Sequence, residues 1–121
     1  MSNQREIIEK LLKEGQIHVV FDSRYPGVRL PDSIERRPDQ TIALSLKFPE
    51  ADIEISEYFI GAELLFGSRR FPTTIPFASI WAVKSFVSGD VYMFQAHVPP
   101  ATRRVDDDVV GPADYSRLTK N

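Results

Sequence analysis

The sequence of 121 residues contains no cysteine and only two histidines. The lack of cysteine excludes disulfides, thiol catalysis, iron–sulfur clusters and cysteine-ligated zinc. Two histidines leave few ligands for any other metal. An excess of positive charge is missing as well, because the 15 Lys and Arg residues are outnumbered by 17 Asp and Glu residues. A nucleic-acid-binding protein needs a basic excess to neutralise phosphates. We therefore expect no metal, no cofactor and no nucleic-acid partner.

Long apolar segments are also missing. No stretch approaches the roughly 20 apolar residues that a membrane-spanning helix needs. The first ten residues, MSNQREIIEK, carry charges where a signal peptide has its apolar core. These absences predict a soluble, cytoplasmic protein that does not contact a membrane.

Aromatic residues are concentrated in the first part of the chain. Residues 1–95 contain 12 of the 13 aromatic side chains, and residues 96–121 contain only Tyr115. The second segment has three prolines, three consecutive aspartates and no sustained period. Such a segment does not bury enough apolar surface to offset the entropy lost on ordering. We therefore predict a domain over residues 1–95 and a flexible tail over residues 96–121.

The first periodic segment is helical. In residues 3–14 the apolar side chains recur at helical spacing and charged residues occupy the other positions. The apolar stripe consists of Ile7, Ile8, Leu11 and Leu12. An isolated helix this short is marginal in water. The stripe must therefore pack either on its own domain or on a second subunit.

After Gly15 the period changes to two, which is typical of strands. We expect strands at residues 17–22, 40–48, 51–57, 58–66, 69–75, 81–86 and 91–94, and one helical turn at 77–80. In the second of these, Ile42, Leu44, Leu46 and Phe48 alternate onto one face. A helix followed by six or seven short strands predicts a mainly β domain, either a small, strongly bent barrel or a sandwich.

The sequence contains no G-x-S-x-G elbow, P-loop or G-x-G-x-x-G motif. His18 and Asp22 lie about 13 Å apart along a strand, which is too far for a direct acid–base pair. A packed or surface histidine is the commoner explanation of His18. A small hydrolase thus has no supporting residues, and we expect that the protein is not an enzyme.

The segment 58–66 is apolar on both faces of the expected strand. In one layer of a small barrel only one face needs burial. Apolar residues opposite would then line a groove suited to an extended peptide. A strand buried on both sides explains the same pattern equally well. The sequence pattern alone leaves both interpretations open.

A series of short motifs carries a family resemblance. In chain order they are HVVFD (18–22), YPGVRLP (25–31), DQTIALSLKFP (39–49), FGS (66–68), TIPFASI (74–80) and MF (93–94). Together they resemble the stringent starvation protein B (SspB) family of adaptors for the ClpXP protease, over about residues 7–95. This chain departs from the family at Ser68, where a second glycine is common, and at Leu65, where an arginine can occur.

The resemblance implies a fold and a function. The fold would be an N-terminal helix with two small antiparallel sheets, close to an Sm-like or SH3-like barrel. The stripe Ile7, Ile8, Leu11 and Leu12 would form the interface of a homodimer. Each subunit would hold the ssrA degradation tag of a tagged polypeptide in a groove, and the tail would dock on the ClpX unfoldase.

The resemblance also implies site residues. His18, Lys47, Phe48 and Leu64 align with residues at the tag groove, and Leu64 is bulkier than the alanine often found there. From strand alternation we add Leu46 and Phe66 as apolar residues in the wall of this groove. The ending Arg117, Leu118, Thr119 and Lys120 resembles the motif of the family that docks on ClpX.

An alternative of another class is an Sm-like RNA-binding or cyclic-nucleotide-sensing small barrel. Arg69, Arg70 and the scattered aromatic residues would serve such a function. The acidic balance and the lack of a combined aromatic and basic cluster argue against it.

Overall fold

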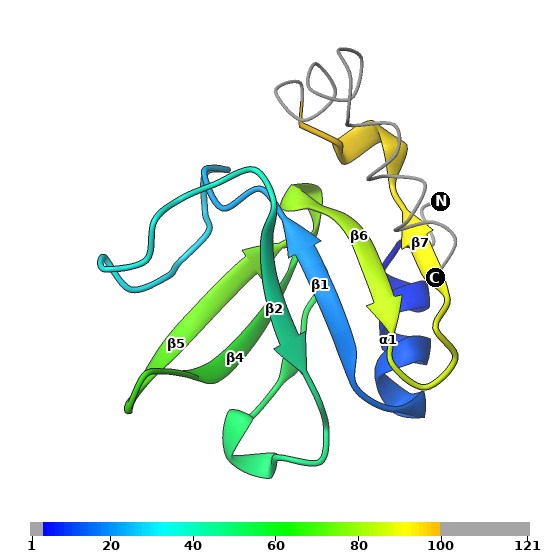
Figure 1. Cartoon of the computed structure of the whole chain (residues 1–121), viewed down its shortest axis with the longest axis horizontal. Coiled ribbons are helices and arrows are strands. Elements are labelled where there is room, and N and C mark those ends of the chain that lie inside the picture. The colour runs from blue at the N-terminus through cyan, green and yellow to red at the C-terminus, as the bar shows by residue number, and fades with distance from the viewer. Residues whose placement is uncertain (1–3, 100–121) are drawn as a thin grey trace.

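A computed structural model describes residues 4–99 of the chain. The helix and strands are α1 (Gln4–Glu14), β1 (Ile17–Phe21), β2 (Gln40–Leu44), β3 (Glu54–Ile55), β4 (Phe59–Phe66), β5 (Arg69–Pro76), β6 (Ile80–Ser85) and β7 (Val91–Met93) (Figure 1). Three short 3₁₀ turns are η1 (Pro49–Ala51), η2 (Phe77–Ser79) and η3 (Gln95–His97). The prediction of a mainly β domain with an N-terminal helix is confirmed. The predicted docking motif at residues 117–120 lies outside the described residues.

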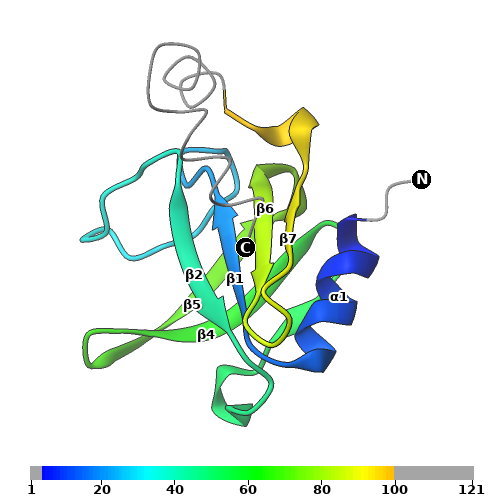
Figure 2. The ribbon, with the colours of Figure 1, turned by 45° about the vertical axis from the view of Figure 1, so that its right-hand side comes forward.

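The strands form two antiparallel sheets, and neither of them closes into a barrel. The four-stranded sheet has the order β2-β1-β6-β7, and the three-stranded sheet has the order β3-β4-β5. The three-stranded sheet crosses behind the four-stranded one, and α1 lies on the side of β6 and β7 (Figures 1 and 2). The prediction of two small antiparallel sheets is thus confirmed as well.

The apolar stripe of α1 packs into the core of its own chain. Ile8, Leu11 and Leu12 are at most 4% exposed, and Ile7 is partly buried against the same core. Their neighbours in this core include Ile17, Val19 and Phe21 of β1, Ile60 of β4 and Ile75 of β5. Side chains buried in this way do not reach a second subunit. The packing therefore corrects the assignment of Ile8, Leu11 and Leu12 to a dimer interface, and Ile7 packs against the same core while staying partly exposed.

The strand predicted over residues 40–48 ends at Leu44, so its continuation over 45–48 is wrong. The Ser45 hydroxyl accepts the Lys47 N–H at 3.1 Å, and the chain enters the turn η1 at Pro49. A serine that bonds its neighbouring backbone competes with the strand ladder, and proline cannot donate to one. Leu46 and Phe48 leave the core face as a result, and both are more than half exposed.

A bulge in β6 creates a second, smaller core on the outer face of the four-stranded sheet. Val20 pairs with Ala82 and Phe21 pairs with Ile80, so Trp81 is the extra residue between them. The Trp81 side chain is buried with Val20, Ala82 and Val98, and its Nε1 donates to the Pro38 carbonyl at 2.8 Å. Because Val98 and Pro99 are buried, the packed part continues through Pro99, four residues beyond the predicted boundary.

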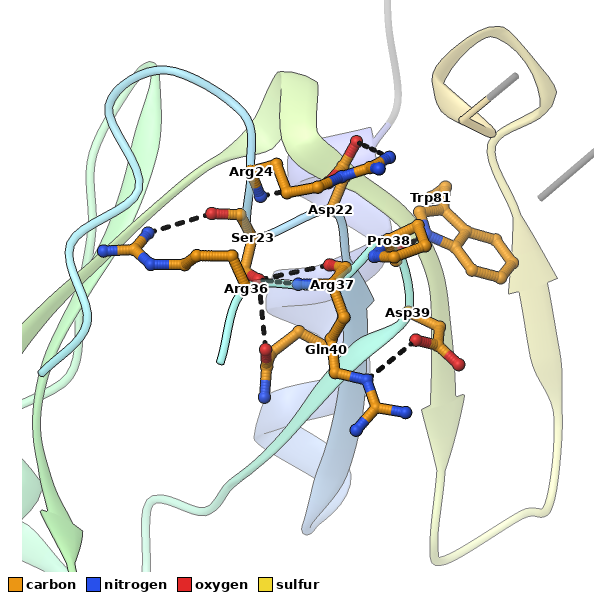
Figure 3. A network of polar contacts seen from close by, with 9 residues as sticks. All are labelled: Asp22, Ser23, Arg24, Arg36, Arg37, Pro38, Asp39, Gln40 and Trp81. Atoms are coloured by element: carbon orange, nitrogen blue, oxygen red, sulfur yellow. Dashed lines mark hydrogen bonds and ion pairs between the residues drawn. The ribbon is translucent and has the colours of Figure 1, made fainter. Parts of the chain in front are cut away.

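A buried serine fastens the long connection from β1 to β2 (Figure 3). Ser23 is fully buried, and its Oγ accepts the Arg37 N–H at 2.8 Å. The Ser23 hydroxyl donates toward the Arg37 carbonyl oxygen and Gln40 Oε1, which lie 3.1 and 3.0 Å from Ser23 Oγ. Arg36 Nη1 donates to the Ser23 carbonyl at 2.9 Å. These bonds tie the end of β1 to the start of β2 and so help to fix where β2 lies.

The network predicts a measurable loss of stability in Ser23→Ala. The substitution removes the acceptor of the Arg37 N–H, and a polar group left without a partner costs about 1–3 kcal/mol. We expect the free energy of unfolding, measured with urea, to fall by that amount. Ser33→Ala is the matched control, because Ser33 is exposed in the same connection. It should change the free energy by less than about 0.5 kcal/mol. Equal effects of the two substitutions would contradict the role of Ser23.

Candidate functional site

Two of the open strand edges in the part of the chain that the structure describes, those of β2 and β4, border the same groove. β2 lies at the edge of its sheet and pairs only with β1. β4 pairs with β5 over its whole length, but β3 reaches only Ile60 and Gly61 of β4. The remainder of β4, residues 62–66, is therefore unpaired on the side of β3. An open edge presents free backbone N–H and C=O groups that a further strand can pair with.

A groove of about 260 Å³ lies between these two edges, and we name it the β2–β4 groove. Its lining comes from the end of β2 (Ala43, Leu44, Ser45), from the connection that follows (Phe48, Glu50, Ala51, Ile53), from β4 (Glu63, Leu64, Leu65) and from β5 (Arg70). Most of these side chains are apolar. Phe48 and Leu65 are 55% and 59% exposed, so the groove presents apolar surface to solvent.

The polar groups of the β2–β4 groove are Ser45, two carboxylates and one guanidinium. Glu63 lies on β4, and Arg70 lies on the adjacent β5, where it pairs in register with Leu65. Arg70 Nη1 donates to the backbone carbonyl of Glu50 at 3.4 Å. The groove thus combines apolar walls with a few groups able to hydrogen-bond a ligand.

The connection between β2 and β3 gives the groove its third side. Its turn η1 is followed by Asp52, which has a left-handed backbone with φ of 47°. Aspartate tolerates this conformation better than most side chains. The residues on either side, Ala51 and Ile53, both line the groove. The sharp reversal at Asp52 therefore directs the two apolar residues that flank it toward the same space.

A second groove lies beside the first, at the C-terminal end of α1. This helix-end groove has a volume of about 680 Å³. It is lined by residues 12–16 (Leu12, Lys13, Glu14, Gly15, Gln16), by Ser45, Leu46 and Lys47, and by Phe86 and Val87. Ser45 lines both grooves, so the segment after β2 separates them.

The six residues predicted to bind a peptide lie in different places. Phe48 and Leu64 line the β2–β4 groove, whereas Leu46 and Lys47 line the helix-end groove. His18 and Phe66 line neither of the two. The His18 ring packs against Phe86 with ring centroids 4.3 Å apart. Phe66 is partly buried against the main core and contacts Phe71 edge-on.

Sequence reasoning missed several residues of the β2–β4 groove, among them Ala43, Ala51, Ile53 and Arg70. Their meeting depends on where β2 ends and on how short β3 is, and alternation of apolar residues reports neither. Ser45 and Pro49 were the sequence signal for the early end of β2, since both residue types favour the end of a strand.

Comparison with known proteins adds no identification. No model of a known protein family matches the chain, and no curated protein matches it. Within residues 4–99, no group of three or more histidine and carboxylate side chains is placed to hold a metal ion. The same residues contain no helix long and apolar enough to cross a membrane.

His18 predicts a pH dependence of stability. Burial and, to a smaller extent, the positive charge of Lys84 lower the pKa of His18 from its ordinary value of 6.5. The unfolded chain then binds a proton more readily than the folded chain, so stability falls as the pH is lowered through 6.5.

We expect this fall in urea unfolding measured between about pH 7.5 and about pH 5.5, a range that brackets the ordinary histidine pKa. The decrease should be smaller in His18→Phe. The second histidine, His97, is present in both proteins, so the difference between the two profiles reports His18. Parallel profiles would show that His18 does not carry the effect.

Proposed function

We propose that this protein is a peptide-binding adaptor of the SspB type. It holds ssrA-type degradation tags in the β2–β4 groove and tethers the tagged polypeptides to the ClpX unfoldase of ClpXP in the cytoplasm. The observation that carries the proposal is an apolar groove between two open strand edges. Such edges suit extended peptides, because main-chain hydrogen bonds give affinity and side-chain pockets give selectivity.

The exposed apolar side chains of the groove set the expected affinity. A peptide laid along the groove would cover Phe48 and Leu65, each of which is already about half buried. Completing their burial contributes about 0.8–1.5 kcal/mol each, half of the value for a whole side chain. Backbone pairing and apolar peptide side chains must supply the rest of the roughly 8 kcal/mol that a micromolar complex needs. A moderate affinity suits an adaptor, since tethering multiplies weak contacts.

The same edges support an inference about fold class. Pairing of β2 with residues 62–66 of β4 would join the two sheets into a small barrel. We infer an open Sm-like or SH3-like barrel in which a bound peptide occupies the place of that missing pairing. The groove needs no catalytic residue, metal or cofactor for this function.

A homodimer remains part of the proposal, because two subunits would supply two grooves and two tails. Since Ile8, Leu11 and Leu12 are buried in their own chain, a second copy would meet other surfaces. The segment 117–120 would dock each tail on ClpX. Weak contacts at both ends would then add through avidity, by about 10²–10⁴ in favourable geometry.

Titration of a fluorescent ssrA-type peptide tests the site. We expect binding by the full chain in the micromolar range or tighter, and at least about a tenfold loss in Leu64→Gln. Leu65→Gln should show a similar loss, and because Leu65 is exposed this variant leaves the core intact. Tyr58→Gln is the matched control, because Tyr58 is 73% exposed and lines neither groove.

Two outcomes of the titration would overturn the proposal. The first is unchanged peptide affinity in both leucine variants, which would move binding away from the β2–β4 groove. The second is an absence of peptide binding together with salt-sensitive binding of RNA, which would favour a nucleic-acid function.

If the tail docks on ClpX, its removal should separate peptide binding from delivery of the substrate to ClpXP. Removal of residues 113–121 should leave the peptide affinity unchanged, because these residues are remote in sequence from the groove. The same deletion should abolish the stimulation of degradation of a tagged substrate by ClpXP. Stimulation that survives the deletion would contradict the assignment of Arg117–Lys120 as the docking motif.

A further inference from the structure

The helix-end groove exposes apolar surface that the proposed peptide site does not use. Leu46, Phe86 and Val87 are each between 51% and 65% exposed. Phe86 is held in place, because its N–H donates to the Gln16 carbonyl at 2.9 Å and its ring packs against His18. The groove is therefore a preformed surface, and exposed apolar patches of this kind mark interaction sites.

Lysines surround this apolar surface. Lys13 and Lys47 line the groove, and Lys84 pairs in register with His18, which contacts Phe86. The three ion pairs within residues 4–99 join Arg5 to Glu9, Arg24 to Asp22 and Arg37 to Asp39, so none of them neutralises these lysines. The lining contains one acidic side chain, Glu14. The carbonyl end of α1 adds partial negative charge, which Lys13 offsets. A ligand complementary to the groove is apolar and negatively charged.

We propose that residues 105–110 of this chain bind in the helix-end groove. Their sequence, VDDDVV, places three aspartates between valines, which suits lysines beside an apolar floor. The other charge clusters after residue 99 are basic, at Arg103–Arg104 and at Arg117 with Lys120. Within this part of the chain, residues 105–110 are thus the acidic and apolar segment.

The end of the described chain lies within reach of the groove. Val98 packs against Val20 of β1, and Ile17, where β1 begins, lies three residues before Val20, or about 10 Å along the strand. Gln16 at the groove directly precedes Ile17. Residues 100–105 span up to about 20 Å when extended. A segment attached in this way has an effective concentration in the millimolar range, so even a weak contact is populated.

Paramagnetic relaxation measured by NMR on the full chain tests this contact. The sequence has no cysteine, so Gly111→Cys provides one unique attachment site for a nitroxide label. We expect the label to broaden the amide signals of Lys47, Phe86 and Val87 and to leave that of Tyr58 unchanged. Replacing Asp106, Asp107 and Asp108 by asparagine in the labelled chain should remove the broadening. Asp114→Asn is the matched control and should preserve it.

Three results would overturn the proposal. Absence of broadening at Lys47, Phe86 and Val87 would show that the segment does not occupy the groove. Broadening that persists in the triple asparagine variant would show that the aspartates do not direct it. Broadening of an unlabelled, ¹⁵N-enriched chain by a labelled chain without ¹⁵N would show that a second copy supplies the segment. None of these results depends on peptide binding in the β2–β4 groove.

Discussion

The early end of β2 is the constraint on which the candidate site depends. If β2 continued from Leu44 through Phe48, as its alternating residues suggest, the segment after Leu44 would extend the four-stranded sheet. Instead the Ser45 hydroxyl captures the Lys47 N–H and the chain turns into η1. This turn brings Phe48, Ala51 and Ile53 over the open edge of β4 and leaves Leu46 facing the other groove. The hydrogen bond from the Lys47 N–H to the Ser45 hydroxyl thus lies in the segment that separates the two grooves.

The rest of the domain holds these edges in place. α1 fills the core with Ile8, Leu11 and Leu12, and the Gln4 side chain donates to the carbonyls of Phe77 and Ile80 at 2.9 and 3.0 Å. On the opposite face, Trp81 bonds the Pro38 carbonyl, close to where β2 begins. A rigid frame matters for a binding site made of backbone edges, because a preorganised edge loses little entropy when a peptide pairs with it. The packing of α1 and Trp81 thus stabilises the domain, and the proposed function lies in the grooves.

Much of the fold could be predicted from the sequence, because local periodicity reports helices and strands directly. The helix, the strand β1 and the strands β4 and β5 all lie within two residues of their predicted bounds. Periodicity does not report what an apolar stripe packs against, so it leaves open whether α1 packs on its own domain or on a second subunit. The dimer interface was implied by the family resemblance, whereas the stripe packs into the core of its own chain. Periodicity also does not report the burial of a segment that has no period, as at Val98 and Pro99. Of the candidate site, Phe48 and Leu64 were found, and the residues brought in by the turn at Asp52 were not.

In the proposed complex a peptide joins the fold as a strand between β2 and β4. Amide hydrogen exchange of the full chain, measured with and without a saturating ssrA-type peptide, tests this claim most directly. We expect new protection at amides within Gln40–Leu44 or residues 62–66, because a paired edge exchanges only when it opens. Protection confined to other strand edges, such as β5 or β7, at a peptide concentration that saturates binding would contradict it.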